Sequence, residues 1–382
     1  MPDAAPSDTP ARATGTPPPA ARSTLALVVA VSLVTISLVT GSTVAVLYRH
    51  YDHNLRVDDI TPQLGTDRPT PHPVSAPKGP VNILIMGSDD RDAPGNQIDD
   101  LTGIGKRSDT TILLHLSGDR QRAYGVSIPR DSIVDRPSCL DKDGTPVSAP
   151  ASAVLWNDAF DIGGAGCTAR QFEQLTGVPI DHYVVVDFAS FEGMVDALGG
   201  VEVCIPEPIV DPKHGIDLAA GTRTLTGRTA LTYVRARYNV GDGSDLSREK
   251  RQQAFVASMV HDVLSADTLA DPFAVTHFLD SATTSLTLDQ DLGSLRKLGA
   301  LGYEFRHIGL DRIQFLTTPT QPYAGTMQVE WAPAAQTLWH DLYLDRPLPD
   351  FLLDGAIDAG NVPGVTHPGH GRPGADANGL CT

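Results

Sequence analysis

The sequence predicts an α/β fold with three α-β-α layers, in which helices flank a central mixed sheet, plus an N-terminal transmembrane helix. Short apolar runs of strand length, such as Val81–Met86 and Thr111–Leu116, alternate with stretches of helical periodicity. A tight turn at Gly118–Asp119 follows the second run, so the strands on either side of it should be antiparallel neighbours. Because strands and helices alternate along the chain, helices should cover both faces of the sheet.

The N-terminal residues do not fit a globular domain. Residues 1–22 are rich in Pro, Ala, Ser and Thr and are predicted to be a disordered cytoplasmic tail. Residues 23–48 carry no charge, and at about 1.5 Å per residue they can cross roughly 30 Å of hydrocarbon. A cleaved signal peptide is the alternative, but Tyr48–Tyr51 does not resemble a small-residue cleavage site. We therefore expect a retained single-pass anchor in the membrane bilayer.

Three further regions follow the predicted span. Residues 49–80 are rich in proline and are interpreted as an extracellular stalk. Residues 81–347 hold the predicted elements and form the expected catalytic domain. Residues 348–382 are rich in Gly and Pro and are predicted to be a flexible tail. The formal net charge of −17 argues against a general nucleic-acid binder, which would need a basic face.

The remaining elements are predicted from periodicity and from turn residues. A third strand, Ala123–Ile128, follows the turn at Gly118. The later strands are expected at Tyr183–Val186, Val201–Ile205 and Ile313–Thr317. The helices are expected at Ala169–Thr176, Phe188–Leu198, Gly227–Thr232, 247–264, 272–282, 292–303 and Ala334–Leu342.

Arginine and aspartate recur at one end of each of the first three strands. Asp89 and Arg91 follow the first strand, Arg107 and Asp109 precede the second, and Arg130 follows the third. In an antiparallel arrangement of these strands, the three motifs lie at the same edge of the sheet, as a site requires. Aspartate also favours turns and helix caps, so a purely structural role for both carboxylates is the alternative.

A second group of arginines lies between Tyr233 and Gln253. If Tyr233–Arg237 is extended, Arg235 and Arg237 point to the same side. In the helix that follows, Arg248, Arg251 and Gln252 have the spacing of one helical face. Guanidinium groups bind phosphate oxygens in pairs, so the cluster favours a diphosphate ligand. A solvated basic helix end is the alternative interpretation.

These motifs, read in order, resemble the LytR-CpsA-Psr family of bacterial cell-envelope proteins. The resemblance covers residues 80–345 approximately and rests on the following runs: Asn82–Arg91, Arg107–Thr110, Ser127–Asp131, Asp181–Tyr183, Asp196–Val201, Tyr233–Arg237 and Arg248–Gln253. Members of this family are membrane-anchored phosphotransferases that move a glycopolymer from a polyprenyl-diphosphate carrier to peptidoglycan. The glycopolymer is of the teichoic-acid, capsule or arabinogalactan type.

The resemblance implies roles for individual residues. Asp89 and Asp109 would hold Mg²⁺ on the diphosphate, a ligand set that suits this hard cation. Arg91 would support Asp89 through an ion pair. Phosphate binding is implied for a larger set: Arg107, Arg130, Arg235, Arg237, Arg248 and Gln252, to which the helical spacing adds Arg251. The family's usual Lys-Ile-Asn run is replaced here by Leu155–Asn157, so no lysine is available at that position.

Two other functions use the same residues. The arginines and aspartates could bind a polyprenyl phosphate without turnover, as in a regulator or scaffold, or could hydrolyse the diphosphate, as in a pyrophosphatase. Neither a GxSxG motif nor a P-loop occurs in the sequence, which argues against the common hydrolase and ATPase sites.

Four cysteines lie after the predicted span: Cys139, Cys167, Cys204 and Cys381. They show no CxxC spacing, and an even number of widely spaced cysteines is typical of disulfides in an oxidising compartment. We predict a Cys139–Cys167 bond, which leaves Cys204 with Cys381. The catalytic domain is therefore expected outside the cell, on a single-pass protein of the cell membrane.

Overall fold

The structure is a computed structural model that describes residues 19–73, 78–89, 108–212, 216–236, 240–264, 272–305, 308–365, 376 and 380–381. The chain divides into two units, residues 1–50 and Tyr51–Thr382. Helix α1 spans Pro19–Asn54 and continues from the first unit into the second. Its part from Thr24 to Asn54 has the length and apolar composition of a membrane span, and its most apolar stretch is not buried in the protein. The N-terminal helix expected from the sequence is therefore present, and it is longer than predicted.

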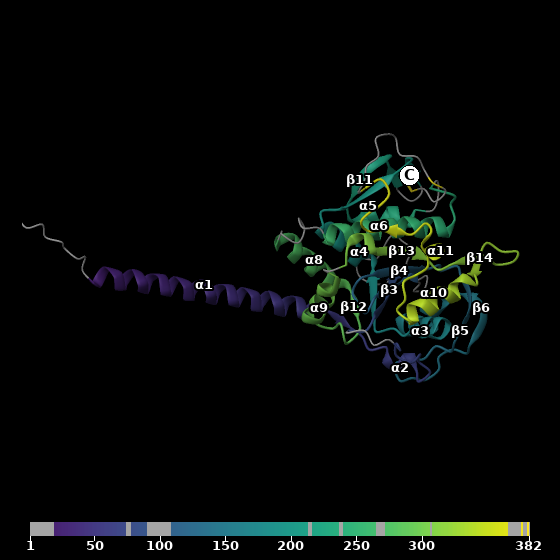
Figure 1. The fold of residues 1–382 in the computed structure, drawn as a ribbon, viewed down its shortest axis with the longest axis horizontal. Coiled ribbons are helices and arrows are strands. Elements are labelled where there is room, and N and C mark those ends of the chain that lie inside the picture. The colour runs from purple at the N-terminus through teal and green to yellow at the C-terminus, as the bar shows by residue number, and fades with distance from the viewer. Residues whose placement is uncertain are drawn as a thin grey trace, which may run out of the picture. The chain divides into compact units, whose positions relative to one another are not determined.

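An eight-stranded mixed sheet forms the centre of the second unit (Figure 1). β2 runs antiparallel to β3, β3 antiparallel to β4, and β4 parallel to β13. On the other side of β2, β7 is parallel and β12 is antiparallel to β7. In spatial order the strands are β1 (Arg56–Val57), β12 (Thr287–Leu288), β7 (His182–Asp187), β2 (Val81–Ser88), β3 (Ser108–Leu116), β4 (Ala123–Ile128), β13 (Ile313–Thr317) and β16 (Ile357–Asp358).

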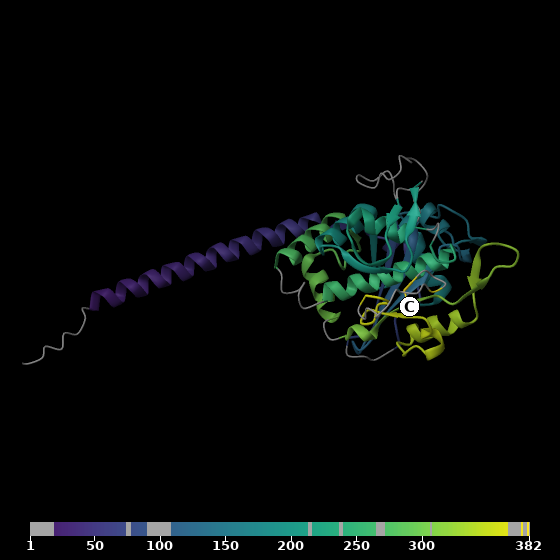
Figure 2. The same cartoon turned by 90° about the horizontal axis from the view of Figure 1, so that it is seen from above.

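The period-two alternation of strand residues supplies both faces of this sheet with apolar side chains. In β13, Leu316 packs on one face, whereas Ile313 and Phe315 pack on the other. The first face is covered by α3 (Asp158–Thr176), α10 (Ala334–Tyr343) and α11 (Asp350–Leu353), and the second by α6 (Asp245–Leu264). Figure 1 shows α6 above the strands and α3 and α10 below them, and Figure 2 gives the view from above. The predicted three-layer arrangement is confirmed.

Smaller elements surround the three layers. The helices are α2 (Thr61–Leu64), α4 (Phe188–Ala197), α5 (Gly227–Arg235), α8 (Pro272–Ser285), α9 (Leu295–Phe305) and a 3₁₀ turn at Leu310–Arg312. The short strands pair as β5 (Ile133–Arg136) with β6 (Ala151–Leu155), β8 (Val201–Ile205) with β11 (Gly221–Leu225), β9 (Ile209–Asp211) with β10 (Ile216–Leu218), and β14 (Thr320–Pro322) with β15 (Val329–Trp331).

The helix predicted at Ala169–Thr176 begins earlier, at Asp158. Its backbone departs from helical angles at Gly163 and Gly164, and Gly164 has a φ of 61°. Glycine tolerates this left-handed conformation, so the chain turns there and continues as a helix. The two glycines concealed the first part of the helix from sequence analysis.

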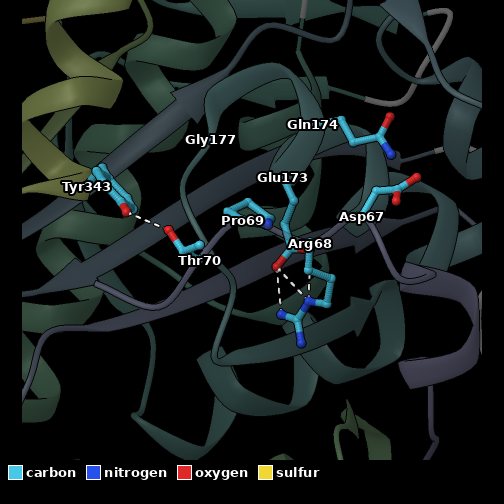
Figure 3. A pocket seen from close by; sticks show the side chains of 8 residues that line it. All are labelled: Asp67, Arg68, Pro69, Thr70, Glu173, Gln174, Gly177 and Tyr343. Carbon is cyan, nitrogen blue, oxygen red and sulfur yellow. Dashed lines mark hydrogen bonds and ion pairs between the residues drawn. The ribbon is translucent and has the colours of Figure 1, made fainter. Parts of the chain in front are cut away.

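The segment interpreted as a stalk is largely part of the folded body. β1 adds an edge strand to the central sheet, and Ile60 and Leu64 are buried in its core. Further along, Arg68 pairs with the buried Glu173 of α3 at 2.6 Å, and the hydroxyls of Thr70 and Tyr343 lie 2.9 Å apart (Figure 3). The interpretation as an extended stalk is wrong for these residues, because apolar and paired side chains attach them to the body.

The predicted C-terminal tail also contributes to the fold. Within it, α11 packs in the core through Leu352, and β16 pairs with β13. Cys381 is bonded to Cys204 of β8, which attaches the end of the chain to the body. Residues 366–375 and 377–379 lie outside the described part. The description as a flexible tail is wrong for residues 348–365.

Both predicted disulfides are present. Cys139 is bonded to Cys167 across 28 residues, and Cys204 to Cys381 across 177 residues. In the chain-entropy account, closing the shorter loop stabilises the folded state by roughly 3–4 kcal/mol. No described cysteine is a free thiol.

Candidate functional site

The ends of β2 and β4 and the beginning of β3 lie together at one edge of the sheet. Ser88 at the end of β2 is opposite Ser108 at the start of β3, and Thr111 of β3 is opposite Ile128 at the end of β4. The antiparallel pairing of β3 with β4 was expected from the tight turn at Gly118, whereas that of β2 with β3 was a condition of the prediction. The two pairings bring the Asp89 and Arg130 motifs to the same edge, as the sequence predicted.

The ladder between β2 and β3 contains an irregularity at this edge. Gly87 is opposite Thr110, but the next residue, Ser88, is opposite Ser108, so Asp109 is an additional residue on β3. An insertion of this kind bends the strand and redirects its side chains, and such bulges are frequent beside active sites. Asp89 follows Ser88 directly and is buried. The backbones of the two aspartates are therefore near neighbours.

Some predicted site residues lie outside the described part of the chain. Arg91, Arg107 and Arg237 are among them, as is the side chain of Asp109. Their proposed contacts with Mg²⁺ or phosphate stay predictions.

Two of the remaining arginines share one carboxylate. Arg130 Nε lies 3.3 Å from Asp245 Oδ1, and Arg248 Nη2 lies 2.6 Å from the same oxygen. Arg130 comes from the end of β4, whereas the other two residues are in the first turns of α6. The side chain of Arg130 is 16% exposed and that of Arg248 is 4% exposed. Asp245 thus holds two guanidinium groups from separate elements close together in a largely dry environment.

Arg235 lies at the end of a helix rather than in a strand. α5 extends through Arg235, so the prediction that Tyr233–Arg237 is extended is wrong for the part that is described. The apolar face formed by Ala230, Leu231 and Val234 packs in a core with Phe255 of α6, and this packing favours the helix. The guanidinium of Arg235 lies over the Phe188 ring, 4.7 Å from its centroid. That cation–π contact fixes its position at the end of α5.

Gln252 and Arg251 differ in position, although they are adjacent on α6. Gln252 accepts a hydrogen bond from Thr110 Oγ1 at 3.2 Å and donates to the Val234 carbonyl at 3.1 Å. It therefore joins the edge of the sheet to α5. Arg251 is fully buried and donates to Ser247 Oγ and to the Ala236 carbonyl.

The burial of Arg251 corrects the prediction that it binds substrate. Adjacent helical residues are about 100° apart around the axis, so Arg251 points toward the interior, where it orients the end of α5. Arg251 is therefore a positioning residue for the segment that carries Arg235.

The sequence did not single out three residues of α6: Asp245, Glu249 and Gln253. Gln253 donates to the hydroxyls of Ser127 and Thr317 at the ends of β4 and β13. Glu249 is buried, and burial raises the pKa of its carboxyl well above the usual range. Asp245 and Asp131 raise this pKa further, whereas Arg248 opposes them. The spacing of Asp245 and Arg248, three residues apart on a helix, was the one signal that could have revealed this pair.

The position that departs from the family pattern has a structural role. Trp156 is fully buried, and its indole nitrogen donates to Thr111 Oγ1 at 3.1 Å. Its backbone amide donates to the Ser132 carbonyl, just after the Arg130 motif. The Trp156 side chain is therefore fixed to β3 and its backbone to the loop after β4, where the resemblance had led us to expect a lysine nearby.

Of the two predicted Mg²⁺ ligands, the structure describes the side chain of Asp89, whose carboxylate is of the kind that Mg²⁺ prefers. Carboxylate oxygens are its preferred protein ligands, and it usually keeps several waters and substrate phosphate oxygens. Within the described residues, no three His, Cys, Asp or Glu side chains gather as a complete metal-binding group. A cation held by Asp89 and Asp109 would take its other ligands from a diphosphate and water.

Comparison with known proteins identifies the family. The model of the LytR_cpsA_psr family matches residues 47–340, which include the whole central sheet apart from β16. The chain belongs to this family. The match begins before β1, in agreement with the finding that the supposed stalk is part of the fold.

Characterised relatives are cell-wall proteins. The chain is 30% identical over 281 residues to the cell wall biosynthesis protein LcpA of Corynebacterium glutamicum, covering 66% of this chain and 52% of that protein. It is 29% identical over 239 residues to the teichoic acid transferase TagU of Enterococcus faecalis, covering 62% of this chain and 71% of that protein. The match spans about half the length of the Corynebacterium relatives.

Solved structures share the fold. An enzyme of the family from Actinomyces oris superposes with a TM-score of 0.54 at 24% identity, covering 75% of this chain and 95% of that one. TagT bound to LI-WTA superposes with a TM-score of 0.55 at 22% identity, covering 73% and 96%. These similarities establish the architecture, and the chemistry must be argued from the residues of the site.

Proposed function

We propose that this protein transfers a glycopolymer from a polyprenyl-diphosphate carrier to peptidoglycan. The observation that carries the proposal is the pairing of Arg130 and Arg248 with Asp245 at the end of β4. Several arginines in a largely dry site suit a ligand with more than one negative phosphate, because the guanidinium is always charged and binds oxygens in pairs. The relatives TagU and TagT, named for transfer of polyisoprenyl-linked teichoic acid to peptidoglycan, support this substrate class.

The proposed reaction is a single displacement at phosphorus. A hydroxyl oxygen of the peptidoglycan acceptor attacks the phosphorus that carries the glycopolymer. The new P–O bond forms as the bridging P–O bond to the second phosphate breaks, and polyprenyl phosphate leaves. The hydroxyl proton passes to a base or to water, and the described residues do not identify that base. Chemistry of this type depends mainly on positioning and on neutralising phosphate charge.

Each described side chain has a part in this positioning. Arg130 and Arg248 bind the diphosphate oxygens, and Asp245 keeps the two guanidinium groups in place before the substrate arrives. Arg235 adds positive charge from the end of α5. Mg²⁺, when bound at Asp89 and Asp109, would supply further neutralisation of phosphate charge. Fixed charges in a dry site stabilise a developing oxyanion more strongly than water does.

We also propose that α1 anchors the protein by a single membrane span, with the folded body outside the cytoplasm. The two disulfides support this orientation, because such bonds persist in oxidising compartments. A membrane span also favours a lipid-linked substrate, because the protein and the substrate would then be held at the same membrane. Protease added to intact spheroplasts should then digest residues 51–382, whereas protection of that region would reverse the orientation.

Reconstitution tests the reaction. The purified chain is incubated with a polyprenyl-diphosphate glycan donor and peptidoglycan, and the products are separated. Polymer joined covalently to peptidoglycan is the expected result. Release of free glycan phosphate without transfer would indicate a pyrophosphatase, and tight binding of the donor without any product would indicate a regulator or scaffold.

A further inference from the structure

Helix α9 is attached to the residues that follow the apolar span. The side chain of Asp52 accepts a hydrogen bond from the backbone amide of Leu295, the first residue of α9, at 3.0 Å. Val57 packs closely against Gly293. A Cβ atom added at Gly293 would lie only 2.9 Å from Cγ2 of Val57. β1 also pairs with β12, so the segment from Asp52 to Val57 contacts both β12 and the start of α9.

Chain length places this attachment close to a membrane. Asp52 is four residues after Tyr48, the end of the uncharged run, and α1 remains helical through Asn54. Four residues of helix advance about 6 Å. The polar headgroup layer on each side of the hydrocarbon is of similar thickness, roughly 5–8 Å. If the span is embedded as proposed above, the first turn of α9 lies at the level of the headgroups.

The outer side of α9 suits such a surface. Arg296 and Lys297 are exposed, and Tyr303 is 59% exposed two turns later. A Cβ added at Gly299 or Gly302 would meet no atom within 4 Å, so nothing in the described structure covers this side. Basic side chains attract anionic lipids, and tyrosine is enriched at the boundary between lipid and water.

The nearby acidic groups do not cancel these cations. Lys297 lies 3.6 Å from Asp291, but the Asp291 side chain is 84% exposed, and exposed pairs of this kind are weak. Among the described residues, no carboxylate forms an ion pair with Arg296. Glu304 faces away, because it pairs with Lys78 at 2.7 Å and with Arg120 at 2.9 Å. These contacts also fix the C-terminal end of α9 to the body.

The geometry points to a second membrane contact: the outer side of α9, through Arg296, Lys297 and Tyr303, binds the headgroups of anionic phospholipids. This inference rests on the proposed span in α1. Figure 1 shows α9 and β12 together at one flank of the body. β1 lies at that edge of the sheet, and β2 is three strands further in. Three strand spacings are about 14 Å, so docking of this flank would hold the site near the membrane that carries the lipid substrate.

Site-specific labelling tests the contact in the full-length chain. The described cysteines are all in disulfides, so Gly299→Cys would introduce a selective site for a fluorophore. Met327→Cys is the matched control, because Met327 is 98% exposed on the loop between β14 and β15. Both variants are reconstituted in phosphatidylcholine vesicles with or without phosphatidylglycerol, and quenching by headgroup-attached quenchers is measured.

We expect strong quenching at position 299 with phosphatidylglycerol, and little at position 327. Adding Arg296→Glu and Lys297→Glu should reduce quenching at 299 to its value in pure phosphatidylcholine, whereas Arg223→Glu, at an exposed position on β11, should not. Equal quenching at 299 and 327 would overturn the inference. So would quenching that requires an added anionic wall polymer instead of the lipid.

A separate measurement distinguishes failure of the underlying span. Co-flotation of the protein with vesicles after an alkaline wash reports insertion of α1, whatever α9 does. A protein that floats but shows no difference between the two labels refutes the contact of α9 alone. If the protein does not float, α1 is not inserted in the membrane. The contact of α9 depends on that span, so both proposals then fail.

Discussion

Arg248 Nη2 lies 2.6 Å from Oδ1 of Asp245, one turn earlier on α6. The same oxygen receives Arg130 from the end of β4, so a single carboxylate fixes the separation of two cations. Without it, the two guanidinium groups would repel each other and lose their common orientation.

Asp245→Asn should therefore weaken donor binding more than it slows the chemical step. A neutral amide cannot balance the two nearby positive charges as the carboxylate does, so we expect KM to rise roughly tenfold to a hundredfold with a smaller change in kcat. Steady-state kinetics at fixed acceptor concentration measures both. Asp143→Asn, at an exposed turn, is the control. An unchanged KM for Asp245→Asn would show that the pair does not organise the site.

The buried Arg251 should matter for stability. Arg251→Met removes the donor to Ser247 Oγ and to the Ala236 carbonyl, at an expected cost of about 2 kcal/mol. We expect a lower Tm by several degrees. Arg228→Met is a matched control, because Arg228 is 60% exposed and pairs with Glu192 at the surface. If Arg251→Met weakens donor binding and leaves Tm unchanged, Arg251 is a substrate-binding residue as the sequence predicted.

Glu249 should make stability depend on pH. Its raised pKa means that the folded state favours the protonated carboxyl, so this contribution is fully present below the unfolded value, about 4.3. It is lost progressively as the pH rises from there toward the folded pKa. Glu249→Gln cannot ionise, so its Tm should increase relative to that of the unmodified protein between pH 5 and pH 8. A constant difference in Tm across this range would contradict the burial argument.

Asp89 tests the proposed metal site. Asp89→Asn preserves size but removes a charge that Mg²⁺ requires, so we expect transfer to fall by about a hundredfold and Tm to change little. Titration calorimetry with MgCl₂ and a non-reactive diphosphate gives a second measurement, in which the variant should bind Mg²⁺ more weakly. Asp89 is not a metal ligand if two results are obtained together. EDTA would have to leave transfer unchanged, and Asp89→Asn would have to leave both transfer and Mg²⁺ binding unchanged.

Local pattern predicted many of the elements correctly. β4, β8 and β13 were placed with their observed bounds, and α10 to within one residue. These segments combine a clear period with turn residues at their ends, and such signals depend on neighbours in sequence. The tight turn at Gly118 predicted that β3 and β4 are antiparallel, which brings the Asp109 and Arg130 motifs to one edge. The Asp89 motif joins them because β2 is also antiparallel to β3, which the sequence did not require.

Other features depended on long-range packing. Pro-rich composition indicated a stalk, yet Ile60 and Leu64 are buried in one core with Ala169 and Phe172 of α3, more than a hundred positions later in the chain. Tyr233–Arg237 had the spacing of a strand, but burial of Leu231 and Val234 against Phe255 stabilises a helix through Arg235. In both cases the free energy of burying apolar surface exceeded the local preference.

By itself, the sequence determined the apolar span, the order of elements, the set of charged side chains available to bind phosphate and the number of cysteines available to pair. Only the tertiary structure decided which of those charges meet. On α6, one helical register turns Arg248 toward Arg130 and Asp245 and turns Arg251 into the interior. Spacing along a helix fixes the angle between two side chains, but the core against which the helix packs decides which of them is buried.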